Sequence, residues 1–139
     1  MDGELLLNLA GCAAFLGLGA LSAIRGRQSP LAFPTALLCA DLFAYTLLEV
    51  LGNLTAEPHW QWIESAAAAL AGPLLFHLGL TFVGARRSHR ISLGLAYLWF
   101  GGVALACLAP LVHPPLRAFP GSERWAGLML GGIAPTALL

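Results

Sequence analysis

The sequence predicts an all-α, polytopic membrane protein with about five transmembrane helices and its N-terminus outside the cell. Hydrophobic residues make up 58% of the 139 positions and charged residues only 10%, which is far more apolar than a soluble domain of this size. Apolar runs lie near residues 5–24, 33–54, 62–84, 91–112 and 125–139. The first four match or exceed the roughly 20 residues that cross a hydrocarbon core. Short polar turns separate the runs, so the pattern indicates helices that cross repeatedly.

The first run, residues 5–24, follows an acidic N-terminus that contains Asp2 and Glu4. A secretory signal begins with a basic region, so we expect a retained spanning helix here and no cleaved signal.

Arginine placement predicts the orientation. The turns after the first and third runs contain five arginines, Arg25, Arg27, Arg86, Arg87 and Arg90. The opposite side has only Arg117 and Arg124, both in one proline-rich connection. The positive-inside rule therefore places the two arginine-rich turns in the cytoplasm.

The last run begins at Trp125 and stops at Leu139, about 15 residues later and short of a full span, with no polar flank. We expect residues 1–139 to be a single membrane domain that is incomplete at its C-terminus. The alternative is a short protein whose last helix is tilted or only partly inserted.

Ionisable side chains interrupt the second and third runs. Asp41, Tyr45 and Glu49 are spaced by four residues and share an arc of about 80° on a helix. Glu64 and His77 lie on the next run. Charged groups inside a membrane usually face a partner or a water-filled cavity, and they mark ligand, ion or proton sites. The five residues therefore predict a ligand or proton seam between two adjacent, antiparallel helices.

Depth suggests two pairs within this seam. If the two helices are joined near Pro58, Asp41 lies near the level of His77, and Glu49 near the level of Glu64. We expect Asp41 and His77 to form a charge-coupled pair. The alternative is that these side chains only join helices, through hydrogen bonds worth about 0.6 kcal/mol each.

Several other chemistries are not indicated. Without lysine, the chain cannot form a retinal Schiff base. The cysteines lie inside apolar runs with no metal-site spacing, so we expect neither a metal nor a cofactor. No catalytic triad or phosphate-binding loop is present, and we expect no enzymatic activity. A net charge of zero without a basic stripe argues against nucleic acid as a partner.

Two stretches resemble a known family. The basic turn that starts at Arg25 and contains Pro30 leads into a second helix with Tyr45 near its middle. The third run has Pro73 before the aromatic-rich end Phe76–Phe82. Over about residues 5–110, these features resemble the seven-helix N-terminal membrane region of bacterial sensor histidine kinases. The chain departs from that family by lacking a sixth and seventh helix, a phosphoacceptor segment and an ATP-binding segment.

The resemblance implies a sensory input module of a two-component system in the bacterial inner membrane. It would sense a stimulus within its helices, relay it to a cytoplasmic output domain and catalyse nothing itself. Its partners would be the lipid bilayer, a small-molecule or lipid ligand, and a second copy or other membrane subunits. Two alternatives stay open: a small proton- or ion-coupled transporter, and an accessory subunit of a larger membrane complex.

Overall fold

Four long helices make up the part of the chain that the structure describes. This computed structural model describes residues 3–26, 29–55, 57 and 59–113. The helices are α1 (Gly3–Arg25), α2 (Ala32–Thr55), α3 (His59–Phe82) and α4 (Arg90–Val112). Each is long and apolar enough to cross a membrane, since 23 or 24 residues extend about 35 Å. The predicted fifth span, residues 125–139, lies outside the described residues.

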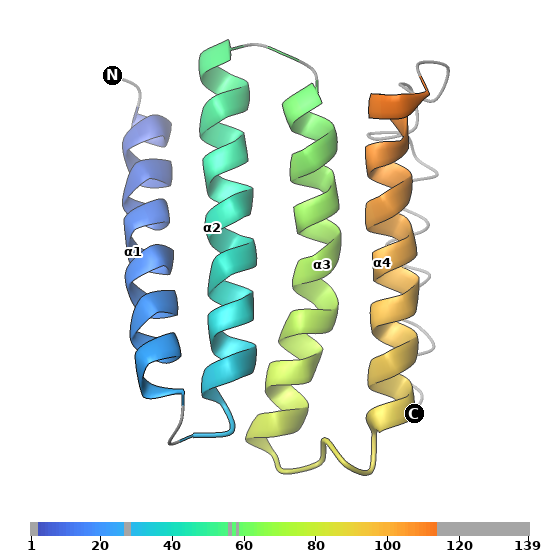
Figure 1. The fold of residues 1–139 in the computed structure, drawn as a ribbon. Helices are drawn as coiled ribbons and strands as arrows, with labels where there is room; N and C mark the ends of the chain where they lie inside the picture. Colours follow the sequence, from blue (N-terminus) through green and yellow to red (C-terminus); the bar gives the residue numbers. More distant parts are fainter. Residues whose placement is uncertain (1–2, 27–28, 56, 58, 114–139) are drawn as a thin grey trace.

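The helices alternate in direction and stand side by side in a single layer (Figure 1). Each helix packs against its neighbour in sequence, whereas non-neighbouring described helices barely touch. The prediction that the second and third runs form adjacent, antiparallel helices is confirmed. A single layer leaves the interface between α2 and α3 open to two sides, because no other described helix packs across it.

Large apolar side chains point away from the layer along all four helices. Leu7, Leu16, Leu54, Leu75 and Leu98 are all more than half exposed. In water this surface would be an aggregation hazard, whereas lipid tails match it. The exposed leucines are therefore consistent with a membrane protein.

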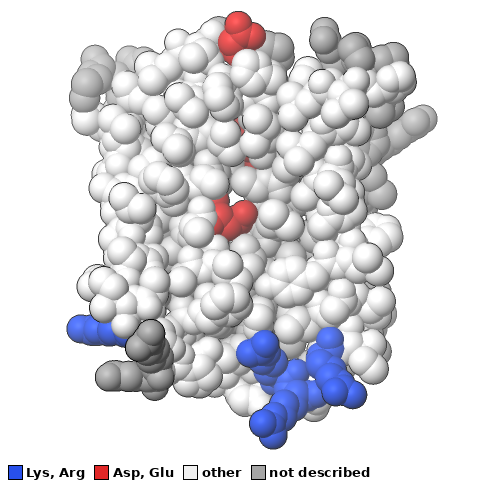
Figure 2. Space-filling view, viewed as in Figure 1, with Lys and Arg blue, Asp and Glu red and all other residues white. Residues whose placement is uncertain are grey.

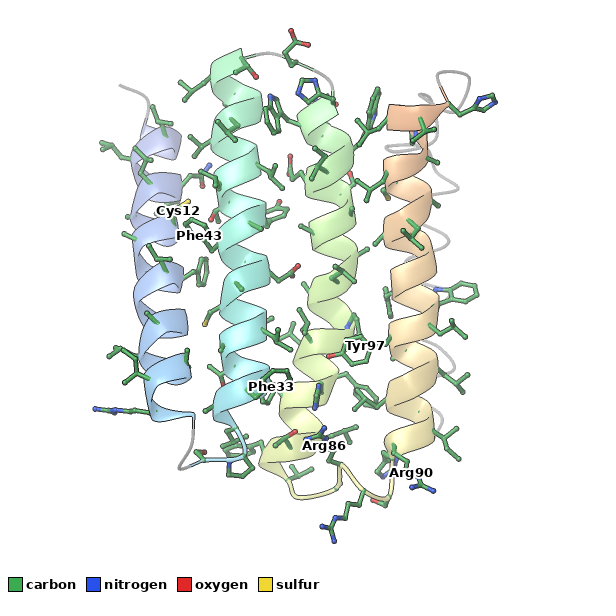
Figure 3. The ribbon with its side chains drawn as sticks, in the orientation of Figure 1. Cys12, Phe33, Phe43, Arg86, Arg90 and Tyr97 are labelled. Carbon is green, nitrogen blue, oxygen red and sulfur yellow. The ribbon has the colours of Figure 1, made fainter. Side chains whose placement is uncertain are left out.

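Small side chains set the contact between α1 and α2. A Cβ atom built on Gly19 would lie 3.2 Å from the Cβ atom of Cys39, so glycine allows a close approach there. Nearer the other end of α1, Cys12 Sγ lies 3.1 Å from Thr46 Oγ1 (Figure 3). The Thr46 hydroxyl also lies within bonding distance of the Leu42 and Phe43 carbonyls. Because that hydroxyl has one hydrogen and donates it to a carbonyl, the Cys12 thiol donates to Thr46.

Apolar side chains fill the interface between α3 and α4. Its buried cluster is Ala66, Ala69, Val103, Ala104 and Cys107. One turn further along, the ring of Phe100 packs over Gly72, at 3.6 Å from a Cβ atom built there. Small residues on α3 thus bring the two helix backbones together, as is usual in membranes, where close packing replaces the hydrophobic effect between helices.

The ends of α3 differ from the predicted range of 62–84. Gly84 has a positive φ of 72°, and two hydrogen bonds, from Gly84 N to the Thr81 carbonyl and from Ala85 N to the Leu80 carbonyl, close the last turn. This is the Schellman arrangement, so Gly84 follows the helix and α3 ends at Phe82. The helix also starts earlier than predicted, at His59.

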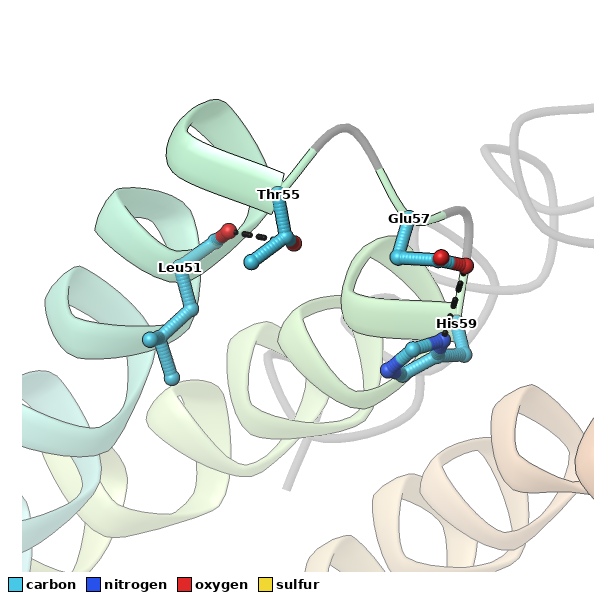
Figure 4. Close-up of polar contacts among 4 residues, drawn as sticks. All are labelled: Leu51, Thr55, Glu57 and His59. Atoms are coloured by element: carbon cyan, nitrogen blue, oxygen red, sulfur yellow. Dashed lines mark hydrogen bonds and ion pairs between the residues drawn. The ribbon is translucent and has the colours of Figure 1, made fainter.

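Polar contacts lie on both sides of the short connection between α2 and α3 (Figure 4). The Thr55 hydroxyl donates to the Leu51 carbonyl at 2.7 Å. The Glu57 carboxylate lies 3.7 Å from Nδ1 of His59, whose ring packs on Trp60 at 4.6 Å between centroids. Ionisable and indole groups gathered at a helix end are typical of the membrane–water interface.

Candidate functional site

The candidate site is built on one face of α2. Since four residues advance a helix by slightly more than one turn, Asp41, Tyr45 and Glu49 lie one above another along α2. The opposite face of α2, which includes Cys39 and Thr46, packs on α1. The polar face is therefore left for α3.

Tyr45, Glu49 and Glu64 come together across the interface between α2 and α3. The Tyr45 hydroxyl and the Glu64 carboxyl group lie close enough to interact, and the Glu49 carboxylate interacts electrostatically with both. Depth explains the meeting. Both helices have 24 residues and a short connection, so position 49 lies within about one residue of the level of position 64. We call Asp41, Tyr45, Glu49 and Glu64 the acidic seam.

Asp41 continues the seam towards the middle of the membrane. It is half-buried, and its Oδ2 atom is buried without a hydrogen-bond partner in the described part of the chain. Acidic residues reach the surface at mid-height of the layer, surrounded by uncharged residues (Figure 2). A carboxyl group in such a place is expensive to keep charged and alone. Asp41 is thus the seam residue whose carboxyl group has an oxygen free to accept a hydrogen bond or bind a cation.

The predicted pair of Asp41 and His77 is wrong as a direct contact. His77 bonds to a different helix, and no hydrogen bond or ion pair joins it to Asp41. Since α2 and α3 have equal length, position 41 lies level with position 73, and His77 is four residues away, about 6 Å along the axis. A shift of one helical turn separates the two side chains.

His77 instead belongs to the interface between α3 and α4. Its side chain is only 5% exposed, and Nδ1 lies 3.0 Å from the Tyr97 hydroxyl, with the two rings edge to face (Figure 3). Its other ring nitrogen, Nε2, is buried without a partner among the described residues. Tyr97 was not among the residues predicted from the sequence to form the site. Counting outward from the loop before α4 would have placed Tyr97 near the level of His77.

No described basic side chain balances the seam. The described arginines, Arg25, Arg86, Arg87 and Arg90, lie at the ends of helices or in the loop between α3 and α4, and Figure 2 shows the basic atoms gathered at one end. Within residues 3–26, 29–55, 57 and 59–113, no group of three metal-binding side chains forms. The seam therefore brings together carboxyl groups and one phenol between α2 and α3, and no described cation lies beside them.

Comparison with known proteins gives no match: no family model, no curated protein and no solved structure matches this chain.

Proposed function

We propose that this chain is a membrane-embedded sensory module whose acidic seam binds protons or a small cationic ligand and relays the binding event to a cytoplasmic output. The observation that supports the proposal best is the meeting of Glu49, Glu64 and Tyr45 between two membrane helices. Two carboxyl groups at one depth repel each other when both are charged, so a proton or a cation between them stabilises the α2–α3 interface.

The arrangement of the helices provides a route for the signal. In a single layer, α2 packs mainly against α1 and α3 among its described neighbours, so a change at the seam shifts α3 relative to α2 without having to repack a central core. Binding that favours one packing over another changes the populations of the two, and that difference is the signal.

In this proposal the N-terminus lies outside and the arginine-rich loops face the cytoplasm of a bacterial inner membrane, with a fifth span after α4. The output domain would be of the two-component type, as the resemblance to sensor histidine kinases implies. The absence of an internal repeat in the sequence favours a sensor over a transporter, since many transporters are built from repeats.

A ligand screen on seam variants tests the proposal. The purified chain in neutral detergent is mixed with inorganic monovalent cations, quaternary amines and polyamines, and its unfolding temperature is measured at several pH values. We expect at least one cation or a pH change to stabilise the wild type, and Glu64→Gln to lose that response. Glu57→Gln is the matched control because Glu57 is an exposed loop carboxylate outside the seam. An identical response in the Glu64 and Glu57 variants would exclude the seam as the binding site.

A second measurement separates the sensor from the transporter. In proteoliposomes, a sensor should bind the cation without carrying it across the membrane, whereas a transporter should produce a flux that Glu64→Gln abolishes. Seam-dependent flux would replace the sensory proposal with the transporter.

A further inference from the structure

Three arginines lie within five positions where α3 connects to α4: Arg86 and Arg87 in the loop, and Arg90 at the start of α4. All three are exposed, and none forms an ion pair with another described residue. The described carboxylates lie elsewhere: three in the seam and Glu57 in the loop between α2 and α3, at the opposite end of the layer. Figure 3 shows Arg86 and Arg90 together at this loop. The cluster is therefore a concentration of positive charge without a described counter-charge.

The start of α4 adds to this positive field. Arg90 is the first residue of α4, and the preceding His89 makes no side-chain capping bond. The first amide N–H groups of a helix lack intrahelical partners, and the N-terminal end of the helix dipole is positive. A cation at this position is unfavourable, whereas an anion beside it satisfies both the dipole and the arginine.

Apolar side chains directly flank the arginines. Phe82 and Val83, before the loop, are 76% and 69% exposed, and Ile91, after it, is 72% exposed. A free anion in water gains nothing from these side chains, whereas lipid acyl chains cover them. Phosphate-binding groups next to exposed apolar groups match the two parts of a phospholipid.

From these observations we propose that Arg86, Arg87, Arg90 and the N-terminus of α4 bind the headgroup of an anionic phospholipid, with Phe82, Val83 and Ile91 against its acyl chains. The site is distinct from the acidic seam and does not depend on the proposed sensory function.

Lipid titration tests this proposal. The purified chain in neutral detergent is titrated with phosphatidylglycerol or with phosphatidylcholine, and bound lipid is counted by native mass spectrometry. We expect phosphatidylglycerol to be retained more tightly than phosphatidylcholine. Each arginine-to-glutamine change in the cluster should weaken phosphatidylglycerol binding about fivefold, the effect of one basic residue at an anionic surface. Arg25→Gln is the control, since Arg25 is exposed at the end of α1 and outside the cluster.

The outcomes separate the proposal from its rivals. Equal retention of the two lipids by the wild type, or equal effects of Arg25→Gln and Arg87→Gln, would overturn it. So would inorganic phosphate displacing the lipid at equal concentration, since the apolar contacts would then contribute nothing. Arg87→Gln is the decisive variant, because Arg87 is an exposed loop residue outside the helices.

Discussion

Individual polar side chains inside the layer fall into two groups with different neighbours. Tyr45, Glu49 and Glu64 share an interface in which charge repels charge. His77 and Tyr97, in contrast, form a hydrogen-bonded contact that joins α3 to α4. Buried polar groups inside a membrane act either as joints between helices or as binding sites. His77 is therefore better explained as a structural link between α3 and α4, and the acidic seam as a binding site.

A double-mutant cycle on His77→Gln and Tyr97→Phe tests the joint. We expect a coupling of about 0.6 kcal/mol, and no more than about 1.7 kcal/mol, in the free energy of unfolding, the range of hydrogen bonds between membrane helices. Reversible unfolding in mixed micelles measures it. The control cycle on Asp41→Asn and His77→Gln should be additive within about 0.3–0.5 kcal/mol, since no bond joins these residues. Coupling in the control cycle and none between His77 and Tyr97 would contradict the assignment.

Pairs of helices are held together at a few close approaches. Between α1 and α2 one close approach is at Gly19, next to Cys39, whereas a Cβ atom on Gly17 would meet nothing within 4 Å. The two glycines lie on the same helix and two residues apart, so they point in different directions. The same substitution at the two glycines changes helix propensity equally, so a difference in stability between the two variants reports packing against α2.

We expect Gly19→Val to destabilise the chain by about 1–3 kcal/mol, the usual penalty for overpacking a close contact, by pushing α1 away from α2. Gly17→Val introduces the same side chain into open space and should have a much smaller effect. Unfolding in mixed micelles compares the two variants. Equal destabilisation would show that the approach of α1 to α2 at Gly19 does not stabilise the chain.

For the whole molecule, the central question is which end of the layer faces the cytoplasm. The α2–α3 connection with Glu57 lies at one end, and the arginine-rich α3–α4 loop at the other (Figures 1 and 2). The positive-inside rule assigns the arginine-rich end to the cytoplasm. With that orientation, a cytoplasmic output domain would lie on the same side of the membrane as the arginine-rich α3–α4 loop.

Cysteine labelling tests the orientation. A membrane-impermeant reagent added from outside should label Glu57→Cys and leave Arg87→Cys unlabelled. Native Cys12, Cys39 and Cys107 are buried, so the wild-type chain should give little background and is the control. Labelling at Arg87→Cys but not at Glu57→Cys would invert the orientation and remove the cytoplasmic relay from the proposed function.

Hydropathy and spacing along the chain were sufficient to predict four of the spans, their antiparallel order and the polar face of α2. These properties are local, because a helix's length and the side chains on each of its faces follow from neighbouring residues. The meeting of Glu49 with Glu64 was also predictable, since both residues are close to the connection between α2 and α3 and small errors in depth do not accumulate. Residues of the fifth predicted span lie outside the described part of the chain.

Only the tertiary structure decided the partner of His77 and the single-layer arrangement. Both depend on how far each helix slides and rotates against its neighbours, and a slide of one turn, about 6 Å, is enough to separate His77 from Asp41. Apolar patterns cannot specify that slide, because lipid and a neighbouring helix are equally apolar surroundings. Close contacts such as Gly19 with Cys39 and Gly72 with Phe100 set it, and those contacts exist only between helices that are already packed.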